Sequence, residues 1–207
     1  MPSEPSRPDR AERPRRRGRA LHRRSFALTL LVLMLPTLGI AQSMQVPSAV
    51  QAELTVKVAG YDRNFAARAG SKAVILLAAM PDDPESMRAA LELKGALSRL
   101  PTVGDLPHEE QIVTFNNAAG LADNVRARKA AIVYFGPGFA KQIPAIREAF
   151  STLDVLTVGA VPDYVPAGIV LGFDLVSGRP KLLINISQAR KQHVAFPASV
   201  LNLMKVY

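Results

Sequence analysis

A glycine–proline–glycine turn is the stretch of this sequence whose residue types could hold an anion. Gly136-Pro137-Gly138 stands between a predicted strand and a predicted helix. Backbone N–H groups at such a junction can bind phosphate. The dinucleotide-binding fingerprint needs a third glycine, and no G-x-G-x-x-G is completed here. Because the same residues suit a tight turn between strand and helix, we expect no cofactor site.

The histidines and paired carboxylates do not form a recognisable active site or metal site. The chain has three histidines and no cysteine, and His108 and His193 lie far apart without metal-ligand spacing. Asp82-Asp83 and Glu109-Glu110 suit a helix start and a loop better than a general acid–base pair. No serine lies in a G-x-S-x-G nucleophile elbow. We expect neither a catalytic residue nor a bound metal, although catalytic residues can also converge from distant loops.

Three side chains are candidates for contact with a partner protein, namely Tyr61, Arg63 and Tyr164. Tyr61 continues the apolar spacing of a predicted helix, whereas Asp62 and Arg63 point elsewhere. One interpretation is a core tyrosine beside solvated charges; the other is an aromatic–arginine pair of the kind enriched at binding hot spots. Tyr164 stands between two prolines in the loop 161–168. That loop is either a partner-facing loop after a strand or a rigid connection into a hairpin.

The hydrophobic pattern predicts alternating helices and strands before residue 160. Continuous apolar runs indicate strands that are covered on both faces, and three- and four-residue spacing indicates helices. Short connections between them imply a three-layer α/β fold, with a mostly parallel sheet and helices on both faces. The predicted strands cover 73–79, 111–115, 130–135 and 153–158, and the predicted helices cover 48–69, 82–100, 120–128 and 139–150.

The last third of the chain predicts an antiparallel hairpin followed by two helices. Two extended runs, 167–176 and 180–186, are joined at Ser177-Gly178-Arg179-Pro180, a sequence typical of a turn. Asn185 or Ser187 can cap a helix over 188–193. Pro197 suits the start of a further helix, whose apolar face would include Val200, Leu201 and Met204.

The N-terminal segment has the pattern of an export signal. A basic stretch, 13–24, precedes an apolar stretch, 26–40, and Gly39-Ile40-Ala41 supplies the small residues that signal peptidase needs. We predict a signal peptide over 1–41, cleaved after about Ala41, then a flexible leader over 42–47 and a single domain over 48–207. The protein would then be periplasmic. A retained membrane anchor is the alternative, but the apolar stretch is short for a span of about 20 residues and contains a proline.

The positive charge of the chain lies mostly outside the predicted domain. The formal net charge is +9, and residues 1–41 hold nine arginines against three acidic residues, a net of +6. A nucleic-acid-binding domain keeps its basic patch on the folded part. We therefore expect no nucleic acid among the partners.

The predicted domain also resembles the YfiR-type periplasmic repressor family, from about Ser48 to Tyr207. The resemblance is carried by Leu156-Thr-Val-Gly159, Gly168-Ile-Val-Leu-Gly172, Lys181-Leu-Leu-Ile-Asn185 with Gln188-Ala-Arg190, the ending Phe196 to Val206, and the helix from Gln51 to Tyr61-Asp62-Arg63. It implies a periplasmic protein that binds the outer part of an inner-membrane signalling enzyme and represses it. That enzyme typically makes cyclic di-GMP. The best-known member has disulfide-forming cysteines, so its redox regulation does not carry over to this cysteine-free chain.

Two functions from different classes follow from these observations. The first is an exported, non-enzymatic regulator that binds and represses a membrane signalling enzyme, a diguanylate cyclase above all, through Tyr61, Arg63 and Tyr164. The second is a periplasmic module that binds a small ligand at the carboxyl ends of the strands. An enzyme of unrecognised type is a third reading. Whether the chain also forms a homodimer stays open at this point.

Overall fold

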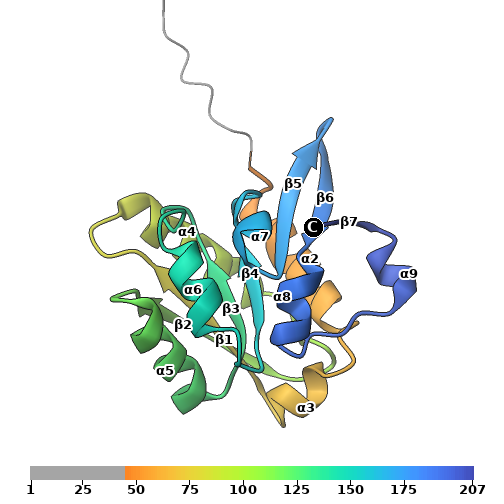
Figure 1. The fold of residues 1–207 in the computed structure, drawn as a ribbon, viewed down its shortest axis with the longest axis horizontal. Coiled ribbons are helices and arrows are strands. Elements are labelled where there is room, and N and C mark those ends of the chain that lie inside the picture. Colours follow the sequence, from red (N-terminus) through yellow and green to blue (C-terminus); the bar gives the residue numbers. More distant parts are fainter. Residues whose placement is uncertain (1–44) are drawn as a thin grey trace, which may run out of the picture. The chain divides into compact units, whose positions relative to one another are not determined.

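One sheet of seven strands runs through residues 45–207, the part of the chain that the computed structural model describes (Figure 1). The strands are β1 (Ala73–Ala79), β2 (His108–Thr114), β3 (Ala130–Phe135), β4 (Leu156–Gly159), β5 (Leu171–Val176), β6 (Arg179–Ile184) and β7 (Met204–Val206). Their order in the sheet is β2-β1-β3-β4-β5-β6-β7. The first five are mutually parallel, β6 runs antiparallel to β5, and β7 is parallel to β6.

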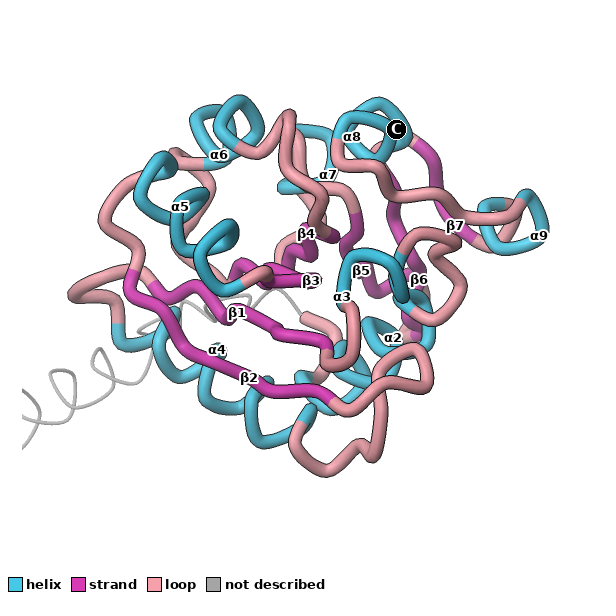
Figure 2. Tube along the Cα trace, turned by 90° about the horizontal axis from the view of Figure 1, so that it is seen from below, coloured by secondary structure: helices cyan, strands magenta, loops and turns pink. Residues whose placement is uncertain are grey.

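Helices cover both faces of this sheet. They are α2 (Ser48–Ala59), α3 (Phe65–Ala69), α4 (Pro84–Leu97), α5 (Ala118–Arg128), α6 (Ile143–Ala149), α7 (Tyr164–Ala167), α8 (Ile186–Lys191) and α9 (Ala198–Leu201). Figure 2 shows α5 and α6 on one side of the strands and α2 and α4 on the other. The predicted three-layer α/β fold, with a mostly parallel sheet and an antiparallel hairpin near its C-terminal end, is confirmed.

The sheet divides the hydrophobic core into two, as strand β1 shows. The apolar run of β1 carries side chains alternately to the two faces, as a strand must. Ile75 and Leu77 belong to the core under α2 and α4, whereas Leu76 and Ala78 belong to the core under α5 and α6. All four are at most 1% exposed. This explains why the run lacks any polar alternation.

Of the four residues predicted for the hairpin turn, Ser177 and Gly178 form it, whereas Arg179 and Pro180 already belong to β6. Ser177 and Gly178 both have positive φ, 50° and 74°, between β5 and β6. Two central residues with positive φ are typical of a type I′ turn, whose twist matches that of the flanking strands. Gly178 adopts this left-handed conformation freely because it has no Cβ, whereas Ser177 adopts it despite its side chain.

Asn185 caps the helix α8, as predicted, and also anchors the loop behind it. Its Oδ1 accepts a hydrogen bond from the Gln188 N–H at 2.9 Å, and its Nδ2 donates to the Val165 carbonyl at 2.9 Å. Asn185→Ala should lower the free energy of unfolding by about 1–2 kcal/mol through the lost cap alone. Urea denaturation measures this, with Ser187→Ala, an exposed position beside the cap, as the control. Equal stability of the two variants would show that Asn185 is not structural.

Several predicted elements have different boundaries in the structure. The predicted helix over 48–69 is two helices, because α2 ends at Ala59 and a turn separates it from α3. The last predicted helix ends at Leu201, and Met204 enters strand β7 instead. Leu91 of α4 is apolar but 56% exposed. The buried stripe runs through Ala90, Leu93 and Leu97, at the three- and four-residue spacing that Leu91 breaks.

The start of the described chain is packed rather than free. Of the predicted leader over 42–47, the structure describes residues 45–47, and there Val46 is 4% exposed. Its carbonyl accepts a hydrogen bond from Gln51 Nε2 at 2.7 Å. The predicted signal peptide over 1–41 lies outside the described residues. No helix within 45–207 has the length and apolar character that crossing a membrane requires.

Candidate functional site

The turn between α2 and α3 presents two of the predicted contact residues to solvent. Tyr61 is 47% exposed and Arg63 is exposed as well. The prediction that Tyr61 extends the apolar face of the helix is wrong, because α2 ends at Ala59 and helical spacing no longer applies beyond it. The Arg63 N–H donates to the Ala195 carbonyl at 3.0 Å, which ties the turn to the C-terminal part of the chain.

Asp62, between these two residues, is the buried anchor of the turn. Its side chain is 0% exposed and Oδ2 lies 2.7 Å from Nη1 of Arg68, whose side chain is 2% exposed. Asp62 Oδ1 accepts from the Ala195 N–H at 2.9 Å. Arg68 in turn donates from Nε to Asp154 Oδ1 and from Nη2 to the His193 carbonyl. The interpretation of Asp62 as a solvated charge is therefore wrong.

This anchor has a consequence for binding by Tyr61 and Arg63. A buried carboxylate that is paired and doubly hydrogen-bonded holds its segment in one conformation. Binding then loses little conformational entropy, because the exposed side chains already stand on an ordered backbone. The arrangement is suited to a protein–protein contact and offers no group placed for acid–base or nucleophilic chemistry.

Tyr164 does not join this surface. It is 3% exposed, and its hydroxyl oxygen accepts a hydrogen bond from the Phe139 N–H at 2.9 Å. Burial raises the pKa of Tyr164, so the phenol stays neutral. The expected exposed loop is wrong because a turn at 161–163 starts the short helix α7 and directs the ring inward. Tyr164 follows the carboxyl end of β4, whereas Arg68, the partner of Asp62, bonds Asp154, which lies before the amino end of β4.

The glycine–proline–glycine turn is structural. Tyr164 already occupies the N–H of Phe139, which follows Gly136-Pro137-Gly138. Gly138 has a φ of 93°, and a Cβ there would lie 2.5 Å from Asp83 Oδ2. The nearby Asp83 carboxylate disfavours an anion at this turn. The helix α6 begins only at Ile143, so its N-terminus is not at the turn either. The turn is a close backbone passage that requires glycine.

The remaining chemically active side chains also serve the fold. His108 lies between Glu110 and the Leu100 carbonyl, with Nε2 2.8 Å from that oxygen. Asp83 caps α4 by accepting from the N–H groups of Glu85 and Ser86. Within residues 45–207 no three histidine, aspartate or glutamate side chains gather as metal ligands could.

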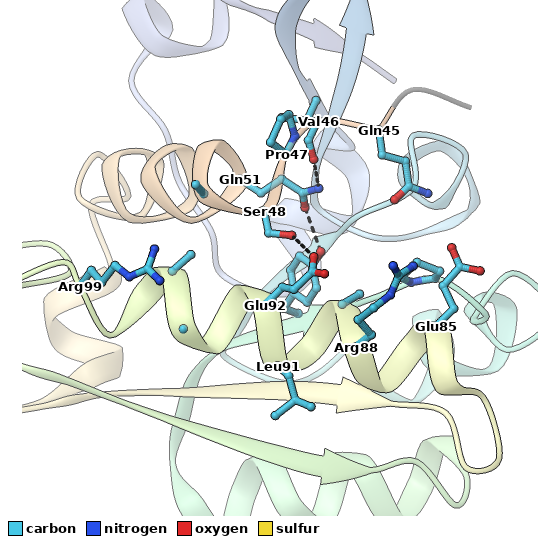
Figure 3. A pocket seen from close by; sticks show the side chains of 16 residues that line it. Gln45, Val46, Pro47, Ser48, Gln51, Glu85, Arg88, Leu91, Glu92 and Arg99 are labelled. Atoms are coloured by element: carbon cyan, nitrogen blue, oxygen red, sulfur yellow. Dashed lines mark hydrogen bonds between the residues drawn. The ribbon is translucent and has the colours of Figure 1, made fainter. Parts of the chain in front are cut away.

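A groove that the sequence did not predict lies between the start of α2 and α4 (Figure 3). It has a volume of about 610 Å³. At its floor, Gln51 Oε1 accepts from the Tyr134 hydroxyl at 2.9 Å, while Gln51 Nε2 bonds the Val46 carbonyl. Burial raises the pKa of Tyr134, so this floor stays uncharged. The sequence gives one indication of this groove, which is a glutamine at a helix position that packing buries.

The rim of this groove carries charges of both signs. Glu85, Arg88 and Glu92 project from α4, Arg99 follows its C-terminal end, and all four are exposed. Ser48 Oγ, at the start of α2, donates to Glu92 Oε2 at 3.1 Å and links the two helices between Arg99 and Arg88 (Figure 3). A mixed rim over a neutral floor suits a small molecule that itself carries both charges.

Solved structures share the fold at low sequence identity. A conserved domain protein from Vibrio cholerae O1 biovar El Tor matches with a TM-score of 0.54 and 17% identity, covering 77% of this chain and 60% of that one. A domain from Streptococcus pneumoniae, solved in complex with L-Trp, has a TM-score of 0.53 and 14% identity, covering 75% and 60%. An open, ligand-free substrate-binding protein with adhesive properties from Clostridium difficile has a TM-score of 0.50 and 11% identity, covering 70% and 57%. The chain thus spans 57–60% of the length of these proteins.

Sequence comparison gives a sharper result than structural similarity. None of the curated proteins matches the chain significantly. The family model described as YfiR/HmsC-like matches residues 48–205, which is most of the described part and includes the segments on which the resemblance rested, except for the last residue, Val206. The chain therefore belongs to the YfiR/HmsC-like family.

Proposed function

We propose that this protein is an exported regulator without catalytic activity that binds the periplasmic part of an inner-membrane signalling enzyme, a diguanylate cyclase, and holds it inactive. The observation that carries the proposal is the family match over residues 48–205. Proteins of this family are periplasmic and regulatory rather than catalytic.

The anchored turn is the surface that best supports binding. Tyr61 and Arg63 are exposed side chains of the two kinds most enriched at interface hot spots, apart from tryptophan. Asp62 fixes the backbone between them, so their contact with a partner needs no ordering of the turn. Tyr164 is no longer part of this surface, because its ring is buried.

Arg63→Ala should weaken binding to the periplasmic part of a diguanylate cyclase encoded beside this gene. Truncation at the centre of an interface reduces affinity by about 2 kcal/mol or more, which is roughly 30-fold in Kd. Calorimetric titration of the purified proteins measures this. Arg126→Ala, an exposed arginine on α5, is the matched control and should bind like the wild type. Equal affinity of both variants would remove the turn from the interface.

The groove favours a second candidate function, a periplasmic module that binds a small ligand. The observation behind it is the 610 Å³ space with Arg88 and Arg99 on its rim, and one structural neighbour was solved with an amino acid, L-Trp. A thermal-shift screen against amino acids decides, since a ligand raises Tm by mass action. A concentration-dependent rise that Arg88→Ala abolishes would favour this function. No shift with any amino acid would leave regulation as the better account.

A further inference from the structure

The strand β7 forms one edge of the sheet and directs its free hydrogen-bonding groups outward. The Tyr207 N–H donates to the Ile184 carbonyl at 2.8 Å, and the Tyr207 carbonyl accepts from the Ile186 N–H. Backbone groups alternate along a strand, and the register pairs Lys205 with Leu183. Lys205 therefore also faces β6. The N–H and C=O groups of Met204 and Val206 then point away from β6, to the open edge.

Exposed apolar side chains gather around this edge. Of the six large apolar side chains that are exposed within residues 45–207, four lie on the β5–β6 hairpin or around β7, namely Val176, Leu203, Val206 and Tyr207. Val206 is 54% exposed and shares a sheet face with the buried Met204. By contrast, the opposite edge strand β2 is polar, and its side chains are engaged, with Glu109 bound to Lys72 and Gln111 bound to Arg128. The two edges of the sheet thus have different surfaces.

The positive charge of the β5–β7 region disfavours the binding of a second copy of the chain at this edge. These strands contain Arg179, Lys181 and Lys205 against one acidic residue, Asp174, so three positive charges less one negative give +2. An antiparallel pair of β7 strands that used every free group would set Met204 opposite Val206. Lys205 would then lie opposite its own copy, and like charges directly opposite are destabilising. An acidic partner strand meets no such repulsion.

We propose that the β7 edge accepts an extended segment of another protein, in which acidic and apolar residues alternate, as an added strand of the sheet. Outward backbone groups give such a strand its hydrogen bonds, and alternate side chains meet Val206 on one face and Lys205 with Tyr207 on the other. The inference deepens the proposed function, on which it rests for the kind of partner. The added strand belongs to the signalling enzyme that the anchored turn also contacts.

A photo-crosslinker at Tyr207 in the full chain, produced in its own cells, tests this. We expect a crosslink to an acidic–apolar segment of a different protein, located by mass spectrometry of the joined peptide. Val206→Pro removes only an outward N–H and should reduce the crosslink roughly tenfold, because an interface hydrogen bond is lost. Val206→Thr keeps that N–H and should crosslink normally. A crosslinker at Leu91, exposed on α4, controls for chance contact.

Three further variants keep the result decisive. Lys205→Pro removes an inward N–H and should lower Tm, whereas Val206→Pro should not. If Val206→Pro also unfolds the domain, Lys205→Glu against Lys205→Arg decides, because only the glutamate repels the acidic side chains that meet position 205. A crosslink to a second copy of this chain, or one that none of these changes reduces, overturns the inference. If these variants reduce a crosslink to a protein that is not a membrane signalling enzyme, the β7 edge is still a binding site for an added strand. That result overturns the proposed function instead.

Discussion

Arg68→Ala is expected to lower the free energy of unfolding by about 3–5 kcal/mol, because it leaves a buried carboxylate without its partner. Arg68 and Asp62 have side chains that are 2% and 0% exposed and are joined at 2.7 Å. The same change removes the donors to Asp154 and to the His193 carbonyl. Urea denaturation monitored by circular dichroism gives the value.

The matched comparison for this variant is an arginine in an exposed pair. Arg126 bonds Asp123 on the surface of α5, where the side chains are 54% and 75% exposed. Arg126→Ala should change stability by less than about 1 kcal/mol. The Asp62→Ala/Arg68→Ala double variant should lose less than the sum of the two single losses, because no unpaired charge then remains. Strict additivity would show that the two side chains do not act as a pair.

Tyr164→Ala should destabilise the fold by about 3–5 kcal/mol, as expected for removal of a fully packed aromatic ring. The ring is 3% exposed, and its hydroxyl accepts from the Phe139 N–H. Tyr164→Phe keeps the ring but leaves that buried N–H without a partner, at a loss of about 1–3 kcal/mol. Thermal and urea melts of the two variants measure both effects. Wild-type stability combined with lost partner binding in Tyr164→Ala would restore Tyr164 to the binding surface.

Local sequence signals predicted the parts of the fold that depend on near neighbours. The turn at Ser177-Gly178, the cap at Asn185 and the cap at Asp83 each rest on residues within three positions, and all three are present. Buried strands such as β1 and β3 were equally predictable, because an uninterrupted apolar run has few other interpretations.

The candidate site depended on contacts that no local pattern contains. Asp62 is buried because Arg68 and the Ala195 N–H meet it, and Ala195 lies 133 residues further along the chain. The helical spacing of apolar residues in the sequence continues across Gly60 and therefore predicted Tyr61 on the buried face. In the structure Tyr61 is exposed because α2 ends before it. Tyr164, by contrast, was expected to be exposed but is buried. Its two flanking prolines indicated a loop but not the direction of its ring.

The proposal that this protein holds a membrane signalling enzyme inactive has one direct test. The direct measurement is the cyclic di-GMP content of cells that lack this gene, compared with cells in which it is restored. Deletion should raise cyclic di-GMP, the wild-type gene should return it to the starting level, and Arg63→Ala, although folded, should restore it only in part. An unchanged cyclic di-GMP content in the deletion strain would contradict the account.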